Sequence, residues 1–262
     1  MVSSSLHWTP QPDPSTTVPG VACTTRGLLT MWAGDELPDD VTRVLGHVHA
    51  TIGEREEWAR WPGGWPDDIE SALVDAVFSA RAVYRSERGR GIYASVVAWQ
   101  QTRNRRVYSL GALLAEIDAA GVSGWADSFG NHQIAPRRPA TAPLGRSKAA
   151  AVREAAWMLR QEAINIAGHI TAGNTATAKR VLQSVPGIGY ATASYFLMLL
   201  GAPGIKPDRM IHRFLQDAIG RPSTNARAEQ LLQATAETLG AEAHELDHAI
   251  WSYQSTRAQH RR

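Results

Sequence analysis

The residues between Ser184 and Leu215 combine the features of this sequence that could support chemistry. A tight turn, Pro186 to Gly189, leads into an apolar helix, and a second turn rich in glycine and proline then ends at Asp208. Consecutive backbone N–H groups in a glycine turn beside a helix N-terminus form a site for an anion such as a phosphate. The turn alone also fits an ordinary corner between two helices, and Asp208 alone fits an ordinary helix N-cap.

A second pattern with chemical potential is HELDH, from His244 to His248. Two histidines four residues apart on a helix can bind one zinc ion, with Glu245 as a general base, as in zinc peptidases. Such a site needs a third ligand, and His260 is the candidate that follows. The same helix face carries Asp247 and Trp251, so these side chains could instead pack or line a DNA cleft.

The elements that must position these residues are predicted to be helices, because no stretch after residue 62 alternates like a strand. Residues 1–20 are rich in Pro, Ser and Thr, and a short strand is expected near residues 27–32. The predicted helices cover residues 39–52, 65–86, 92–102, 108–121, 145–164, 176–185, 191–201, 208–220, 225–240 and 241–256. We therefore expect an all-α fold with short connections.

The composition of the chain excludes some classes of protein. The chain has 262 residues, a formal net charge of +2 and a pI near 8.9, which is compatible with nucleic-acid binding without indicating it. Its single cysteine, Cys23, excludes an internal disulfide and an all-cysteine metal site. No apolar run has the length of a membrane span, and the first residues do not read as a signal peptide. We expect a cytoplasmic monomer without membrane contact.

The segment around Asp208 resembles the helix-hairpin-helix DNA glycosylases of the HhH-GPD superfamily. Their signature is a hairpin followed by Thr-Ala, an apolar helix, a Gly/Pro-rich loop and a catalytic aspartate. Val185 to Gly189 matches the hairpin, Thr192-Ala193 follows in register, and Asp208 falls at the aspartate. The resemblance also takes in the Gln-Gln-Thr helix end at residues 100–102 and the Ser-Lys helix start at 147–148, and it covers residues 66–252.

The resemblance implies a DNA N-glycosylase that flips a modified or damaged base out of double-stranded DNA and hydrolyses its N-glycosidic bond. Asp208 would be the catalytic residue, and a monovalent cation could bind the hairpin at Val185 and Gly187. No other cofactor is implied. The residues expected to contact DNA are Gly187, Ile188, Gly189, Gln100, Gln101, Arg103, Lys148 and Lys179, with Gln101 filling the gap left by the flipped base. The residues expected to line the base pocket are Tyr93, Trp99, Trp125 and His132.

Two departures from the family pattern refine this expectation. Members that also cut the strand carry a lysine just before Thr-Ala, and this chain has Ala191 there, which predicts a monofunctional enzyme that leaves an abasic site. Lys206 and Lys148 remain as alternative amines near matched motifs. Some members bind an iron–sulfur cluster through four cysteines, which this chain lacks.

The resemblance predicts two lobes with the DNA and base cleft between them. Residues 91–204 would form a helical barrel carrying the hairpin, residues 66–90 with 205–262 would form the lobe carrying Asp208, and residues 1–65 would be an extension of unknown role. The biological setting would be base-excision repair or defence against phage DNA with modified bases. The alternatives are a non-catalytic helix-hairpin-helix DNA-binding protein and, more remotely, the zinc peptidase.

Overall fold

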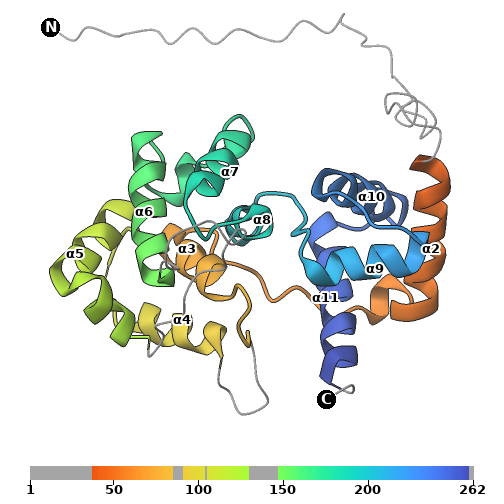
Figure 1. Ribbon diagram of the computed structural model, residues 1–262, viewed down its shortest axis with the longest axis horizontal. Helices are drawn as coiled ribbons and strands as arrows, with labels where there is room; N and C mark the ends of the chain where they lie inside the picture. The colour runs from red at the N-terminus through yellow and green to blue at the C-terminus, as the bar shows by residue number, and fades with distance from the viewer. Residues whose placement is uncertain (1–36, 85–90, 104, 130–146, 260–262) are drawn as a thin grey trace, which may run out of the picture.

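The computed structural model is built from α-helices (Figure 1). It describes residues 37–84, 91–103, 105–129 and 147–259, and within these ranges it contains no strand, so the predicted all-α fold is confirmed. Two short 3-10 helices lie at Arg55–Glu57 and Ala167–His169. The α-helices are α2 (Leu37–Ile52), α3 (Ile69–Phe78), α4 (Ile92–Gln101), α5 (Leu110–Asp127), α6 (Lys148–Gln161), α7 (Thr175–Ser184), α8 (Tyr190–Leu199), α9 (Arg209–Ile219), α10 (Asn225–Thr238) and α11 (Ala243–Gln259).

The buried apolar side chains form two separate clusters. The first core is made by α3 to α8, and the second core by α2 and α9 to α11. Figure 1 shows the two sets of helices as two groups, joined by the segment between α2 and α3 and by the segment between α8 and α9. Residues 200–208, which end at Asp208, therefore cross from the first core to the second.

Helix α3 is the centre of the first core. All ten of its residues are buried, and it packs against α4, α6 and α8. Seven of its ten residues are apolar, and such a helix is stable only when neighbours cover it on every side. We expected residues 66–90 to join the lobe that carries Asp208, but residues 69–78 of this segment pack in the other core.

The structure also corrects the expected extension at residues 1–65, because α2 within it belongs to the second core. On one face of this helix, Val41, Val44 and Val48 are buried in the second core against α9 and α10. This face has the three- and four-residue spacing of an amphipathic helix. The strand expected near residues 27–32 lies outside the described residues. No helix in the described ranges is long and apolar enough to cross a membrane.

Candidate active site

Asp208 is the N-cap residue of α9. Its Oδ1 accepts hydrogen bonds from the backbone N–H groups of Met210 (2.8 Å) and Ile211 (3.2 Å), so both the capping role and the orientation of the carboxylate are clear. Its Oδ2 lies 3.7 Å from Nζ of Lys206, and about a quarter of the side chain (26%) is exposed. One oxygen is thus used to begin the helix, and the other faces an ammonium group at the positive end of the helix dipole.

A second carboxylate holds the loop in front of Asp208. Asp247 of α11 is buried, and its Oδ1 accepts the backbone N–H of Lys206 (2.9 Å). Burial raises the pKa of Asp247 to about 7, nearby Asp208 adds to this effect, and Lys206 opposes it. Nζ of Lys206 also lies 4.1 Å from the ring centroid of Tyr195, a cation–π distance. The site therefore joins two carboxylates and one amine over an aromatic ring.

Aromatic side chains extend from this cluster across the junction of the two cores. Starting at Tyr195, successive ring centroids are 6.4 Å apart to Tyr84, 6.2 Å to Trp251, 5.8 Å to His248 and 5.4 Å to Trp61. We call these five residues the aromatic row. Tyr84 and Tyr195 belong to the first core region, whereas Trp251 and His248 are on α11. Tyr195, the member next to Lys206, is 5% exposed, whereas the other four rings are partly exposed.

One predicted base-pocket residue borders the aromatic row. Tyr93 of α4 stacks on Trp65 with ring centroids 5.9 Å apart and lies 6.0 Å from the ring of Tyr84. The Trp65 indole N–H (2.9 Å) and the Tyr84 hydroxyl (3.0 Å) both donate to Oδ2 of buried Asp75. This carboxylate fixes the edge of both rings, so the aromatic surface is held by α3.

Two other predicted pocket residues are core residues instead. Trp99 and Trp125 are buried in the first core, 5% and 2% exposed, and both indole N–H groups donate to Oε1 of Glu116 (3.0 and 2.9 Å). Their faces are covered by other side chains, so they cannot stack on a base without unfolding the core. His132 lies outside the described residues.

The hairpin between α7 and α8 presents its backbone. Gly187 has φ of +98°, a conformation that favours glycine, whereas Gly189 is extended (φ −96°) and caps α8 without any side-chain hydrogen bond. Ile188 is 3% exposed, so it packs inward, and the partly exposed residues of the turn are its neighbours Gly187 and Gly189. The Val185 carbonyl accepts the Ile188 N–H (3.0 Å), and the cation expected at this turn stays a prediction.

Three residues predicted to contact DNA are bonded to groups within the protein instead. Arg103 is 4% exposed, is paired with Asp68 and Glu70, and lies over the ring of Trp99. Gln100 donates to Oδ2 of Asp68 (3.0 Å). Their partners lie more than thirty residues upstream, on and next to α3, so local sequence patterns could not predict the pairing.

The third of these residues is Lys148. It is 1% exposed, and its Nζ donates to the carbonyl oxygens of Phe78 (2.7 Å) and Ala80 (2.8 Å) at the end of α3. Burial lowers its pKa to about 8. Lysine side chains can satisfy the last carbonyls of a helix, and this lysine serves the first core rather than a DNA surface.

Two predicted DNA contacts remain accessible. Gln101, the last residue of α4, is exposed. Lys179 of α7 is partly exposed and pairs with Glu229 of α10 (2.7 Å), which also accepts the hydroxyl of Tyr190. Glu229 therefore links the hairpin helices to the second core.

The HELDH histidines pack against a tryptophan. The rings of His244 and His248 lie edge-on to Trp61, with centroids 6.2 and 5.4 Å away, and Glu245 pairs with Arg55 (2.7 Å). Within the described ranges, no three side chains of the metal-binding types come together. The expectation that this face packs or borders a cleft thus agrees with the contacts seen.

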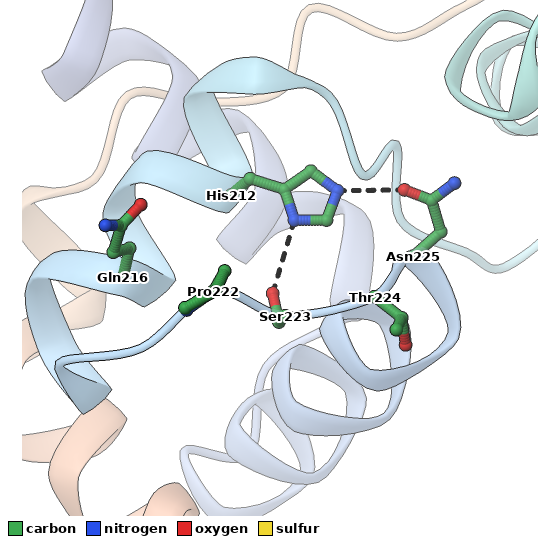
Figure 2. Close-up of a pocket in the computed structure, with 6 residues that line it drawn as sticks. All are labelled: His212, Gln216, Pro222, Ser223, Thr224 and Asn225. Carbon is green, nitrogen blue, oxygen red and sulfur yellow. Dashed lines mark hydrogen bonds between the residues drawn. The ribbon is translucent and has the colours of Figure 1, made fainter.

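Two surface pockets lie near the site without including Asp208. The first, about 460 Å³, lies between α9 and the start of α10. Figure 2 shows its His212 between Ser223 and Asn225, 3.2 Å from the Ser223 hydroxyl and 2.8 Å from the Asn225 side-chain oxygen. The second pocket, about 410 Å³, lies beside the Lys179–Glu229 pair and the connection at Pro203.

The sequence matches, over residues 42–255, a family described as a domain of unknown function (DUF8548). A search of the curated proteins found no significant match. Among solved structures, one described as "Structure of MBOgg1 in complex with low affinity DNA ligand" is similar, with a TM-score of 0.47 and 13% identity, over 85% of this chain and 70% of that chain. A likeness of this size carries no argument about the fold or the activity of this chain.

Proposed function

We propose that this chain, which belongs to the DUF8548 family, is a DNA N-glycosylase that removes a modified or damaged base from duplex DNA and leaves an abasic site. The observation that carries the proposal is the carboxylate of Asp208. Its Oδ1 accepts the hydrogen bonds that cap α9, and its Oδ2 takes no part in capping. The residue lies where the chain passes between the two cores.

The chemistry of base removal requires such a group. Breaking an N-glycosidic bond builds positive charge on the sugar, and a fixed carboxylate stabilises that charge without having to reorient during the reaction. The same carboxylate can orient or deprotonate the attacking water. Because two backbone N–H groups hold Oδ1, Asp208 is preorganised by the fold itself.

The surroundings of Asp208 suit a flipped nucleotide. An extruded base needs flat side chains on which to stack, and four members of the aromatic row are partly exposed: Tyr84, Trp251, His248 and Trp61. The DNA backbone would bind the N–H groups at Gly187 and Gly189, a contact that is independent of sequence. Exposed Gln101 would enter the duplex where the base has left.

The proposal is tested with Asp208→Asn. Asparagine keeps an oxygen that can cap α9 but removes the charge, so we expect single-turnover excision to fall by about 10²–10³-fold while duplex binding changes little. The substrates are duplexes carrying alkylated, oxidised, deaminated or mismatched bases and phage genomic DNA, read as alkali-labile sites. The matched control is Asp217→Asn, an exposed carboxylate on the same helix, which should keep the wild-type rate.

Near-normal excision by Asp208→Asn would show that another group performs the chemistry. Binding of duplex DNA with no excision of any base by the wild-type protein would favour the non-catalytic DNA-binding alternative.

A further inference from the structure

The hairpin and Asp208 belong to different cores of the molecule. The hairpin joins α7 and α8 of the first core, whereas Asp208 begins α9 of the second core. In the part of the chain that the structure describes, the helix pairs with extensive contact each lie within a single core. The distance between the hairpin and Asp208 therefore depends on the chain connections and on the side chains that cross the junction of the cores.

One carboxylate crosses this junction with three hydrogen bonds. At Oε1, Glu229 of α10 accepts Nζ of Lys179 (2.7 Å) and the hydroxyl of Ser194 (3.3 Å). Its Oε2 accepts the hydroxyl of Tyr190 (2.5 Å). We call these four residues the Glu229 bridge. The three donors come from α7 and α8, the helices that the hairpin connects, and Tyr190 directly follows Gly189. The bridge thus ties the second core to the hairpin.

The Glu229 bridge differs from an ordinary surface ion pair. The side chains of Lys179 and Glu229 are 19% and 30% exposed, and Nζ of Lys179 lies 3.7 Å from the ring centroid of Tyr190. An isolated exposed pair contributes little to stability, whereas a partly enclosed network of charged hydrogen bonds contributes more. Burial and the Glu229 carboxylate raise the pKa of Tyr190, so its hydroxyl stays a donor.

The junction is hollow beside the Glu229 bridge. A cavity of about 410 Å³ is lined by Lys179, Ser194 and Glu229 and by residues 202–205 of the connection that ends at Asp208. Side chains on opposite sides of a cavity lack the close contacts of a packed interior. At this place the hydrogen bonds of the bridge, rather than apolar packing, resist movement of one core against the other.

We propose that Glu229 is a positioning residue, which sets the distance from the hairpin to Asp208 so that DNA held by the hairpin presents a nucleotide to the carboxylate. The proposal rests on the proposed function, because it assigns a role in the same reaction. A displacement of about 1 Å far from the reacting atoms can lower a rate about 100-fold. Loss of the bridge should therefore slow base excision more than it weakens DNA binding, since the hairpin N–H groups remain.

The first test measures the distance between the cores and needs no substrate. Spin labels are attached to the full chain at Ala119→Cys of α5 and Arg43→Cys of α2, two exposed positions, in a Cys23→Ser background. Electron spin resonance of the label pair gives the distribution of distances. Glu229→Gln keeps the shape of the side chain but loses its charge and one acceptor, so it should broaden this distribution. Glu237→Gln, an exposed position on the same helix, is the matched control and should leave it unchanged.

The second test measures the reaction with the same substitution. With duplexes carrying modified bases, Glu229→Gln should lower the single-turnover excision rate by about 10–100-fold, while the Kd for duplex DNA changes little. Tyr190→Phe removes one donor and should lower the rate less. The double variant should be no slower than Glu229→Gln, because both substitutions act through one bridge. Circular dichroism shows whether each variant is folded at the assay temperature.

An unchanged distance distribution in Glu229→Gln would overturn the positioning role, and so would independent, additive effects of the two substitutions. A broadened distribution with excision at the wild-type rate would also overturn it. If the wild-type protein excises no base, the proposed function fails and the role in excision fails with it, whereas the distance measurement still decides whether Glu229 sets the arrangement of the cores.

Discussion

Asp208 and Asp247 show how two carboxylates in one site come to differ. Asp208 is partly exposed, caps a helix and faces an ammonium, whereas Asp247 is enclosed by α11 and the loop before Asp208. Desolvation disfavours the charged form of Asp247, and the neighbouring carboxylate acts in the same direction. The pH dependence of stability can therefore isolate one of them.

We predict that Asp247→Asn stabilises the protein at pH 8 but not at pH 4. The pKa of Asp247 rises from 3.8 to about 7 on folding, so the native state holds a proton between these values that the unfolded chain has released. Its stabilising contribution is complete below pH 4 and is lost as pH rises through 7. The asparagine oxygen can still accept the Lys206 N–H.

The measurement is the melting temperature of both proteins from pH 4 to pH 8. The difference should grow with pH and exceed about 2 °C at pH 8, the shift expected for roughly 1 kcal/mol in a chain of this size. Glu56→Gln, which changes another exposed carboxylate, should show no such growth. An Asp247→Asn curve parallel to the wild type would mean that Asp247 stays ionised.

At this scale the sequence was informative wherever a residue acts through its own neighbours. The alternative interpretation of Asp208 as an N-cap is correct, because capping depends on the two or three following residues, and its catalytic role stays a prediction. Arg103 was predicted to contact DNA and Trp99 to line the base pocket, but their partners Glu70 and Glu116 come from other helices. A single sequence gives no signal for a pairing between such distant residues.

At the scale of elements, the hairpin between α7 and α8 has one glycine, Gly189, that can be substituted without straining the backbone. A Cβ at Gly189 would meet no atom within 4 Å, and its extended backbone suits a branched residue. Gly187 is unsuitable for the same test because its positive φ would strain any side chain.

We therefore predict that Gly189→Val weakens DNA binding but not folding. The side chain would occupy the space in front of the N–H groups, and loss of a hydrogen bond to a charged group costs about 1.5–3 kcal/mol, or roughly tenfold or more in Kd. Titrations at one fixed salt concentration should show equal weakening for plain and base-modified duplexes. Gly168→Ala, another open position, is the matched control.

Unequal weakening would contradict this assignment. If Gly189→Val lost its preference for the modified duplex but kept its affinity for the plain one, the N–H groups of the hairpin would not bind the DNA phosphates.

For the whole molecule, the fold class followed from periodicity but the partition into cores did not. Helix positions depend on local spacing, and nearly all were predicted. Core membership depends on which faces meet in space. Helix α3 precedes the hairpin by more than a hundred residues and packs against α8, and α2 packs against α9 and α10. Neither contact can be predicted from the pattern of neighbouring residues in the sequence.

The assignment of α2 to the second core predicts a large effect of Val44→Ala. Val44 is fully buried, so removing two methyl groups should lower the free energy of unfolding by about 1–3 kcal/mol. Chemical denaturation measures this change. Val83→Ala, at an exposed position, should change stability by less than about 0.5 kcal/mol. Equal stability of Val44→Ala and the wild type would show that α2 does not help to hold the second core together.

The exposure of the three lysines of this chain allows DNA binding to be detected by chemical modification, because Lys148 is 1% exposed and the side chains of Lys179 and Lys206 are each 19% exposed. Amine-selective acylation should spare enclosed Lys148 and modify Lys179 and Lys206 to the extent that each is exposed. A duplex seated between the cores would shield Lys206, and mass spectrometry of acylated peptides would then record occupancy as a footprint. Such a readout needs neither turnover nor knowledge of the base, so it can rank candidate nucleic acids before any reaction has been found.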